Sequence, residues 1–302
     1  MLHEFAVEPT LLGDWQEFRV LFGKFGVPQA RMIAEFPKKW RKMVYEASVH
    51  FTDIQRKALE DWLSDKDAFL IPNSRAYDIP TDWLRSAETA HAMVPFHAII
   101  AKANPRNCPE VILSGALYEQ HALFQCPREC SMPRDLNGFV VVSESLLKCS
   151  KQIIFVDPFF WKANSERERS ERWGNHFKAL FSILNGASTI RFCTNASPKG
   201  ETVDFREEEI TEKLPPFIPS YIQIEILLLH HNSGNDTHNR YILTERGGIK
   251  FPWGLDTDAS GAEDIVNLME SGTHKSKFLE YSEPEKYGHQ VAKRFVITGT
   301  AT

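Results

Sequence analysis

The pattern of apolar and polar positions divides the chain into a helix-dominated first part and a second part that alternates strands with helices. Apolar residues from Leu11 to Phe25 recur at helical spacing, and Ile54 to Leu63 repeats that pattern. A short apolar strand, His3 to Val7, precedes both helices. Residues 1–135 are therefore predicted to form an α-rich N-terminal region, either a degenerate first repeat or a cap.

The pattern of residues 136–302 predicts an α/β domain with a mixed sheet flanked by helices. The predicted strands are 152–156, 189–194, 222–229, 238–244, 249–253 and 291–298. The predicted helices are 166–184, 207–214 and 263–269, and 274–288 is expected to be a charged loop or short helix. A strand, a helix and a second strand in succession favour a parallel pair joined by a right-handed crossover.

The candidate chemistry lies in His238 and Arg240. Residues two apart on a strand project from the same face, so an imidazole and a guanidinium would lie side by side. An imidazole can attack phosphorus or transfer a proton. A guanidinium offers a planar fork of donors to phosphate oxygens. The pair therefore indicates a site for a phosphoryl group.

The longer pattern is more specific. HNRYILTERGGIKFPWGLD reads H-x-R-x4-E, then Gly-Gly, then a hydrophobic strand that ends in Gly-Leu-Asp. It resembles the His-Lys-Asp signature of the phospholipase D superfamily. Arg240 stands where that family has lysine, and Glu245 stands where it has aspartate. Within the superfamily the pattern looks most like the C-terminal phospholipase D-like domain of the microtubule-interacting-and-trafficking (MIT) domain proteins.

The resemblance implies a phospholipase D-like fold and a phosphodiester ligand. It implies that His238 is the nucleophile and that Arg240 and Glu245 complete the catalytic set, without a metal or a cofactor. Family members with one motif dimerise, so a homodimer is expected. One expectation is a metal-independent phosphodiesterase, such as a nuclease in bacterial defence. The alternative is a non-catalytic module that binds a phosphate-bearing ligand, a lipid headgroup or a partner protein.

Three further residues are candidate phosphate-site residues. Asp157 follows the strand 152–156, and sites in α/β sheets gather at the carboxyl ends of strands. It would orient the imidazole or Arg240, or else cap the following loop. Asp256 ends the Gly-Leu-Asp segment. Lys39 belongs to the basic run 38–42 around Trp40, which is either a solvated helix face or an anion-binding patch.

Two groups of residues raise the question of a metal. Cys108, His121, Cys126 and Cys130 have loose spacing, which favours ordinary thiols over zinc ligands. His230, His231, Asp236 and His238 lie within nine positions, but adjacent histidines rarely bind one ion. His97, without a basic residue two positions on, is interpreted as a packed core histidine. No metal is expected.

Composition and charge narrow the range of possible binding partners and cellular locations. The chain has 302 residues, 42% of them hydrophobic, and a formal net charge of −5. That charge disfavours a protein that coats DNA non-specifically. No apolar run has the length of a membrane span, and the first residues do not resemble a signal peptide. Five cysteines without framework spacing fit a reducing cytoplasm.

Overall fold

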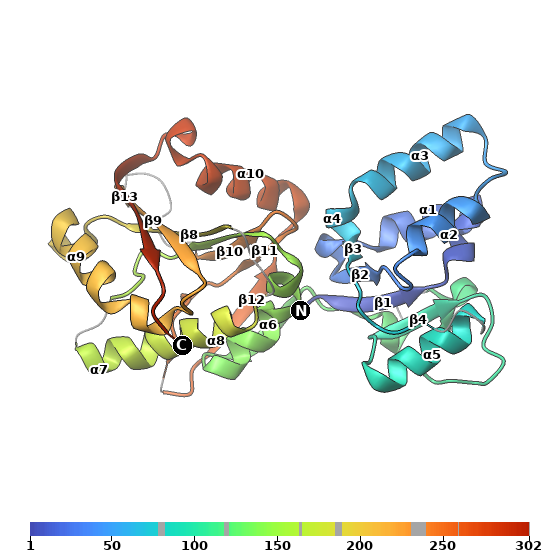
Figure 1. The fold of residues 1–302 in the computed structure, drawn as a ribbon, viewed down its shortest axis with the longest axis horizontal. Coiled ribbons are helices and arrows are strands. Elements are labelled where there is room, and N and C mark those ends of the chain that lie inside the picture. Colours follow the sequence, from blue (N-terminus) through green and yellow to red (C-terminus); the bar gives the residue numbers. More distant parts are fainter. Residues whose placement is uncertain are drawn as a thin grey trace. The chain divides into compact units, whose positions relative to one another are not determined.

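The computed structural model describes residues 1–77, 82–117, 121–162, 165–184, 189–230, 240–258 and 260–301. They form two compact units, Leu2–Arg128 and Glu129–Thr302, the second of which also includes Met1 (Figure 1). The predicted α/β class is confirmed. The predicted boundary after residue 135 lies a few residues too late, because β6 (Glu129–Pro133) pairs with β12 (Glu263–Leu268) in the second unit.

The N-terminal unit is built on a five-stranded sheet of order β3-β2-β1-β4-β5 in which every pairing is parallel. Its strands are β1 (His3–Val7), β2 (Arg31–Ala34), β3 (Leu70–Ile71), β4 (Ala98–Ala101) and β5 (Val111–Leu113). β2 and β4 are buried at every position, as expected of parallel strands covered on both faces. The α-rich description of residues 1–135 therefore overlooked a complete sheet.

Helices flank this sheet, and local signals explain where they begin. They are α1 (Trp15–Lys24), α2 (Trp40–Ala47), α3 (Asp53–Ser64), α4 (Lys66–Phe69) and α5 (Trp83–Met93). Asp14 accepts hydrogen bonds from the first-turn amides of α1. Thr52 and Gln55 form a capping box at the start of α3. Both predicted helices of this region are thus present.

The C-terminal unit contains an eight-stranded mixed sheet of order β13-β9-β8-β7-β10-β11-β12-β6. Beyond β6 and β12 its strands are β7 (Gln152–Val156), β8 (Thr189–Asn195), β9 (Gln223–His230), β10 (Tyr241–Thr244), β11 (Gly248–Lys250) and β13 (Gln290–Thr298). β7, β8 and β9 are parallel, and the other pairings are antiparallel. The parallel run is the part that the strand–helix–strand pattern predicted.

Alternation along β7 sends neighbouring side chains to opposite faces of this sheet. Phe155 packs against Phe177 and Phe181 of α8 on one face. Ile154 and Val156 join a cluster on the other face that includes residues of α10. The helices of this unit are α6 (Leu136–Cys149), α7 (Glu166–Arg169), α8 (Asn175–Ser182), α9 (Val203–Lys213) and α10 (Ser271–Ser282), with a π-helical turn at Ser170–Gly174 joining α7 to α8.

Two element predictions in the C-terminal unit were wrong. The segment 263–269 is the strand β12, in which Asp264, Val266 and Leu268 alternate toward the interior. The segment after it contains the twelve-residue helix α10 instead of a loop or a short helix. In the described part of the chain, no helix is long and apolar enough to cross a membrane.

Candidate phosphate-binding site

The end of the C-terminal sheet where β7 stops and β10 begins, which we call its edge, brings together three of the six predicted site residues: Asp157, Arg240 and Asp256. Asp157 follows the carboxyl end of β7, and Arg240 precedes the amino end of β10. These ends lie together because Tyr241 pairs with Val156 in antiparallel register. The loop 251–258 leaves β11 at the same edge, since the Phe251 amide bonds to the Arg240 carbonyl at 2.9 Å. The sheet topology thus brings together residues nearly a hundred positions apart.

Asp157 is buried and fixed by the backbone. Its Oδ1 accepts a 2.8 Å hydrogen bond from the Phe159 amide, and its Oδ2 accepts one of 2.8 Å from the Leu255 amide. Burial raises the pKa of Asp157 to about 6, although these amides and the charge of Arg240 oppose that shift. The carboxylate therefore caps the loop that follows it, which is one of the two roles that the sequence left open, and it also holds the loop 251–258. Its other predicted role, to orient the imidazole or Arg240, stays a prediction.

Asp256 is a buried acceptor for two arginines. Its Oδ1 accepts a 2.7 Å bond from Nη2 of Arg134, and its Oδ2 accepts bonds from Nε and Nη2 of Arg172, the former at 3.0 Å. Arg134 follows β6, and Arg172 lies in the π-helical turn. Neither arginine was predicted from the sequence. Asp256 therefore joins three distant segments and belongs to the framework of the site.

Glycine is required at position 254 of the same loop. Gly254 has a φ of +131°, which L side chains rarely adopt. A Cβ there would lie 2.7 Å from Oδ1 of Asp256 and 3.4 Å from Oδ2 of Asp157. The backbone therefore approaches both carboxylates more closely than any other residue would allow.

The Arg240 side chain is partly exposed at this edge. Its Nη1 donates a 2.9 Å bond to the Pro252 carbonyl, and its guanidinium carbon lies 5.4 Å from the ring centroid of Phe159. Its positive charge lowers the pKa of Asp157 and of Asp264, against the larger upward effect of burial on both. We call Arg134, Asp157, Arg172, Arg240, Asp256 and Asp264 the edge cluster.

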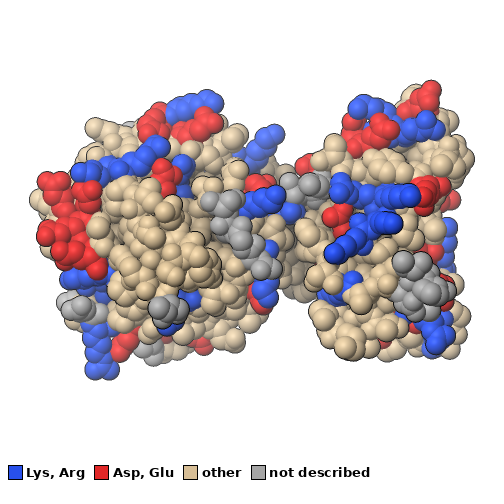
Figure 2. All heavy atoms as spheres, in the orientation of Figure 1, with Lys and Arg blue, Asp and Glu red and all other residues tan. Residues whose placement is uncertain are grey.

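Acidic side chains surround part of this cluster. An open pocket of about 620 Å³ lies beside Arg134 and Arg172, and its lining is Arg134, Asp135, Leu136, Glu168, Glu171, Arg172, Thr257 and Asp258. Four of these eight residues are acidic and two are basic. Acidic side chains also gather over α9 on the face shown in Figure 2. A polyanion would therefore meet repulsion at the pocket.

Glu245 does not belong to the site. It lies beyond the other end of β10, five residues from Arg240, which corresponds to about 17 Å along an extended strand. Its Oε1 accepts a 2.8 Å bond from the Lys151 amide, and its Oε2 accepts one of 2.9 Å from the Gln152 amide. The structure does not bring this carboxylate to Arg240, and it fastens the beginning of β7 instead. Its predicted catalytic role stays a prediction that its position disfavours.

Two other predictions have different outcomes. Lys39 is an exposed residue at the start of α2 in the N-terminal unit, outside the edge cluster. His238 lies outside the described residues, as do His231 and Asp236, so its predicted placement beside Arg240 stays a prediction. The described residues that flank this segment, His230 and Arg240, lie at the carboxyl end of β9 and the amino end of β10.

Comparisons with known proteins assign neither family nor function. No protein-family model matches the chain, and no curated protein matches it. Among solved structures, the archaeal chromatin protein TrmBL2, described as showing a novel mode of DNA binding, is similar with a TM-score of 0.27 and 12% identity. The match covers 80% of this chain and 68% of that one. A TM-score this low supports no statement about fold or function.

Proposed function

We propose that the chain is a phospholipase D-like protein that recognises a phosphodiester at the edge cluster. The observation that carries this proposal is the position of Arg240, a partly exposed guanidinium beside the buried Asp157 where β7 ends and β10 begins. In α/β folds, ligands bind beyond the carboxyl ends of the strands, and Asp157 lies at such an end. Arg240 would donate to non-bridging oxygens, while Asp157 and Asp256 hold the surrounding loop.

In the catalytic form of this proposal, His238 attacks phosphorus. A P–N bond forms, the P–O bond to the leaving group breaks, and a second histidine protonates the departing oxygen. Water then cleaves the phosphohistidine, so the reaction needs no metal. Arg240 stabilises the charge that develops on the phosphoryl oxygens. The second histidine would come from a second copy of the chain, and the substrate would be a nucleic-acid backbone, as in a nuclease of bacterial defence.

The second candidate is a non-catalytic module that binds a phosphate-bearing ligand, a lipid headgroup or a partner protein. Arginine at position 240, where the family has lysine, favours it, because a guanidinium binds phosphate in a bidentate manner. The acidic lining of the neighbouring pocket also favours a small phosphate group over a long polyanion.

Turnover and binding assays on variants separate the two forms. Bis-p-nitrophenyl phosphate, single-stranded DNA and RNA are the test substrates. If the site is catalytic, His238→Ala abolishes turnover, Arg240→Lys retains it and EDTA has no effect. If the site only binds, wild type shows no turnover, while Arg240→Ala weakens binding of a phosphodiester by about 1.5–3 kcal/mol, the contribution of a charge-assisted hydrogen bond.

Matched controls come from exposed residues away from the edge cluster. His50→Ala controls for loss of a histidine, and Lys178→Ala for loss of a positive charge. Both should behave as wild type. Cleavage that requires a divalent metal and survives His238→Ala would contradict the catalytic form. Phosphodiester binding that is unchanged in Arg240→Ala would contradict both forms.

A further inference from the structure

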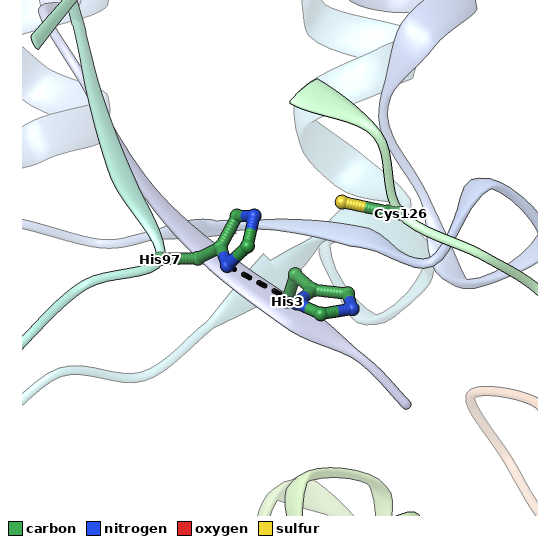
Figure 3. Close-up of side chains that lie close together, drawn as sticks. All are labelled: His3, His97 and Cys126. Atoms are coloured by element: carbon green, nitrogen blue, oxygen red, sulfur yellow. Dashed lines mark hydrogen bonds between the residues drawn. The ribbon is translucent and has the colours of Figure 1, made fainter. Parts of the chain in front are cut away.

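Three possible metal ligands from separate segments meet in the N-terminal unit. The ligand atoms of His3, His97 and Cys126 all lie within 4.8 Å of one another. Figure 3 shows the sulfur of Cys126 pointing toward the pair of imidazole rings. The sequence could not reveal this group, because 94 positions separate the two histidines.

The parallel sheet brings the two histidines together. His3 begins β1, and His97 immediately precedes β4, the neighbour of β1. The His97 amide donates a 2.6 Å bond to the Glu4 carbonyl, which fixes the register at this end. The two Nδ1 atoms are 3.2 Å apart, and the ring of Phe5 packs edge-on against His97. Both imidazoles are therefore held by the sheet and the core.

Arg31 positions the segment that carries the thiol. Arg31 begins β2 opposite His3, and its Nε and Nη2 donate bonds of 3.0 and 2.7 Å to the Phe124 carbonyl. The guanidinium also lies 4.1 Å from the ring centroid of Phe124. Cys126 follows two residues later and is buried. Arg31 thus fastens this segment against the amino ends of the strands.

Burial and nearby charges shift the pKa values of all three side chains. Burial lowers the pKa of His3 to about 4, with further lowering by His97, the N-terminal amine and Arg31. Burial also lowers the pKa of His97, against the opposing effect of a hydrogen bond with the Leu123 backbone. Burial raises the pKa of Cys126, but Arg31 opposes this through its charge and a hydrogen bond.

We propose that His3, His97 and Cys126 bind one zinc ion. Two imidazole nitrogens and one thiolate are ligands that zinc prefers, and three protein ligands leave a fourth position for water. The two Nδ1 atoms share a hydrogen bond of 3.2 Å, which zinc would replace without drawing them apart, because two nitrogens in a tetrahedral site with Zn–N bonds of about 2.05 Å lie about 3.3 Å from each other. A nitrogen and a sulfur would lie about 3.6 Å apart, which is within the 4.8 Å that contains the three ligand atoms.

Binding releases the thiol proton of Cys126 to solvent and leaves both imidazoles neutral. The ion then ties the segment around Cys126 to the amino ends of β1 and β4. Because the ligated form exists only in the folded unit, zinc stabilises the N-terminal unit against unfolding. The site is separate from the edge cluster, so it stands whether or not the proposed function does.

The test is a titration of the full chain, first stripped with a chelator, with Co²⁺ as a spectroscopic substitute for zinc. One equivalent of Co²⁺ should produce a thiolate-to-cobalt charge-transfer band, which Zn²⁺ then abolishes. Cys126→Ser should lose the band. His3→Ala should weaken zinc affinity by more than the roughly 10–100-fold that changes in outer-shell partners cause.

Cys108→Ser is the matched control, since Cys108 is a half-buried thiol of the same unit that bonds to Glu88. It should keep the band. Circular dichroism checks the folding of each variant, and the wild-type titration tests the proposal even where a variant does not fold. A wild type without the band overturns the zinc site. So does a band that survives in folded Cys126→Ser, because the thiolate ligand then lies elsewhere.

Discussion

Single residues in the edge cluster differ in how deeply they are buried and in what they bond. Asp256 accepts from Arg134 and Arg172, so the positive charges of these two arginines are largely directed at a buried carboxylate. Arg240 donates to the Pro252 carbonyl, and its guanidinium lies 5.4 Å from the ring centroid of Phe159. Its side chain is partly exposed, so solvent can reach it at this edge.

The buried carboxylate of Asp157 predicts a pH dependence of stability. Its pKa is raised from 3.8 to about 6 in the folded protein, so folding favours the protonated form. The stability that this group contributes is greatest below its unfolded pKa and is lost as the pH rises through about 6. Relative to Asp157→Asn, wild type should lose on the order of 1–3 kcal/mol of unfolding free energy between about pH 4 and pH 7.

Urea unfolding at the two pH values measures this difference. Asp204→Asn, which removes an exposed carboxylate on α9, is the control and should show a much smaller change with pH. If the stability difference between wild type and Asp157→Asn is the same at both pH values, the carboxylate does not titrate in this range and its burial has no such effect.

A variant of Glu245 tests whether this residue stabilises the fold or takes part in catalysis. Glu245→Ala removes the acceptor for the Lys151 and Gln152 amides. Water can then bond to these exposed amides, so each lost hydrogen bond lowers the free energy of unfolding by about 1 kcal/mol or more. The free energy of unfolding should fall by about 1–3 kcal/mol, whereas phosphodiester binding or turnover at temperatures where the variant is folded should match wild type. Loss of turnover in the folded variant would restore the catalytic role that its distance from Arg240 argues against.

At the scale of elements, sequence pattern was most informative where strands are long and buried. β7, β8 and β9 read as apolar runs because helices cover both faces. β2 and β3 have only four and two residues, too few for a period to show. β12 was mistaken for a helix because six residues of mixed character fit either period, and its pairing with β11 and β6 decides the outcome.

Some residues of the edge cluster could likewise be predicted from the sequence, and others could not. Asp157 could be predicted because a carboxylate directly after a buried strand lies at a sheet edge, and Asp256 because it ends the family-like segment. Arg134 and Arg172 could not, since they reach Asp256 from a strand end and from a helical turn with no shared sequence pattern. Glu245 was predicted at the site because the motif gives only a spacing in sequence. The four residues of β10 between Arg240 and Glu245 form an extended strand, which places Glu245 at the other end of that strand.

At the scale of the whole molecule, two α/β units divide the chain, and each has its own sheet and core. The edge cluster lies entirely within the C-terminal unit, and the proposed zinc ligands lie entirely within the N-terminal unit. The two proposals therefore concern separate cores. Variants in one unit should leave the readout of the other unchanged, which makes Cys126→Ser a further control for phosphodiester binding.

The catalytic form of the proposal makes a last prediction, about assembly. The chain carries one His-x-Arg motif, whereas the mechanism uses two histidines, so an active site would need two copies. Specific activity on bis-p-nitrophenyl phosphate should fall on dilution, in step with dissociation of a dimer measured by sedimentation velocity, because mass action depletes the pair. Adding His238→Ala chains to wild type should lower activity further by forming mixed pairs, whereas His50→Ala chains should not. Constant specific activity in a monomeric sample would show that one chain suffices and would remove the second histidine from the mechanism.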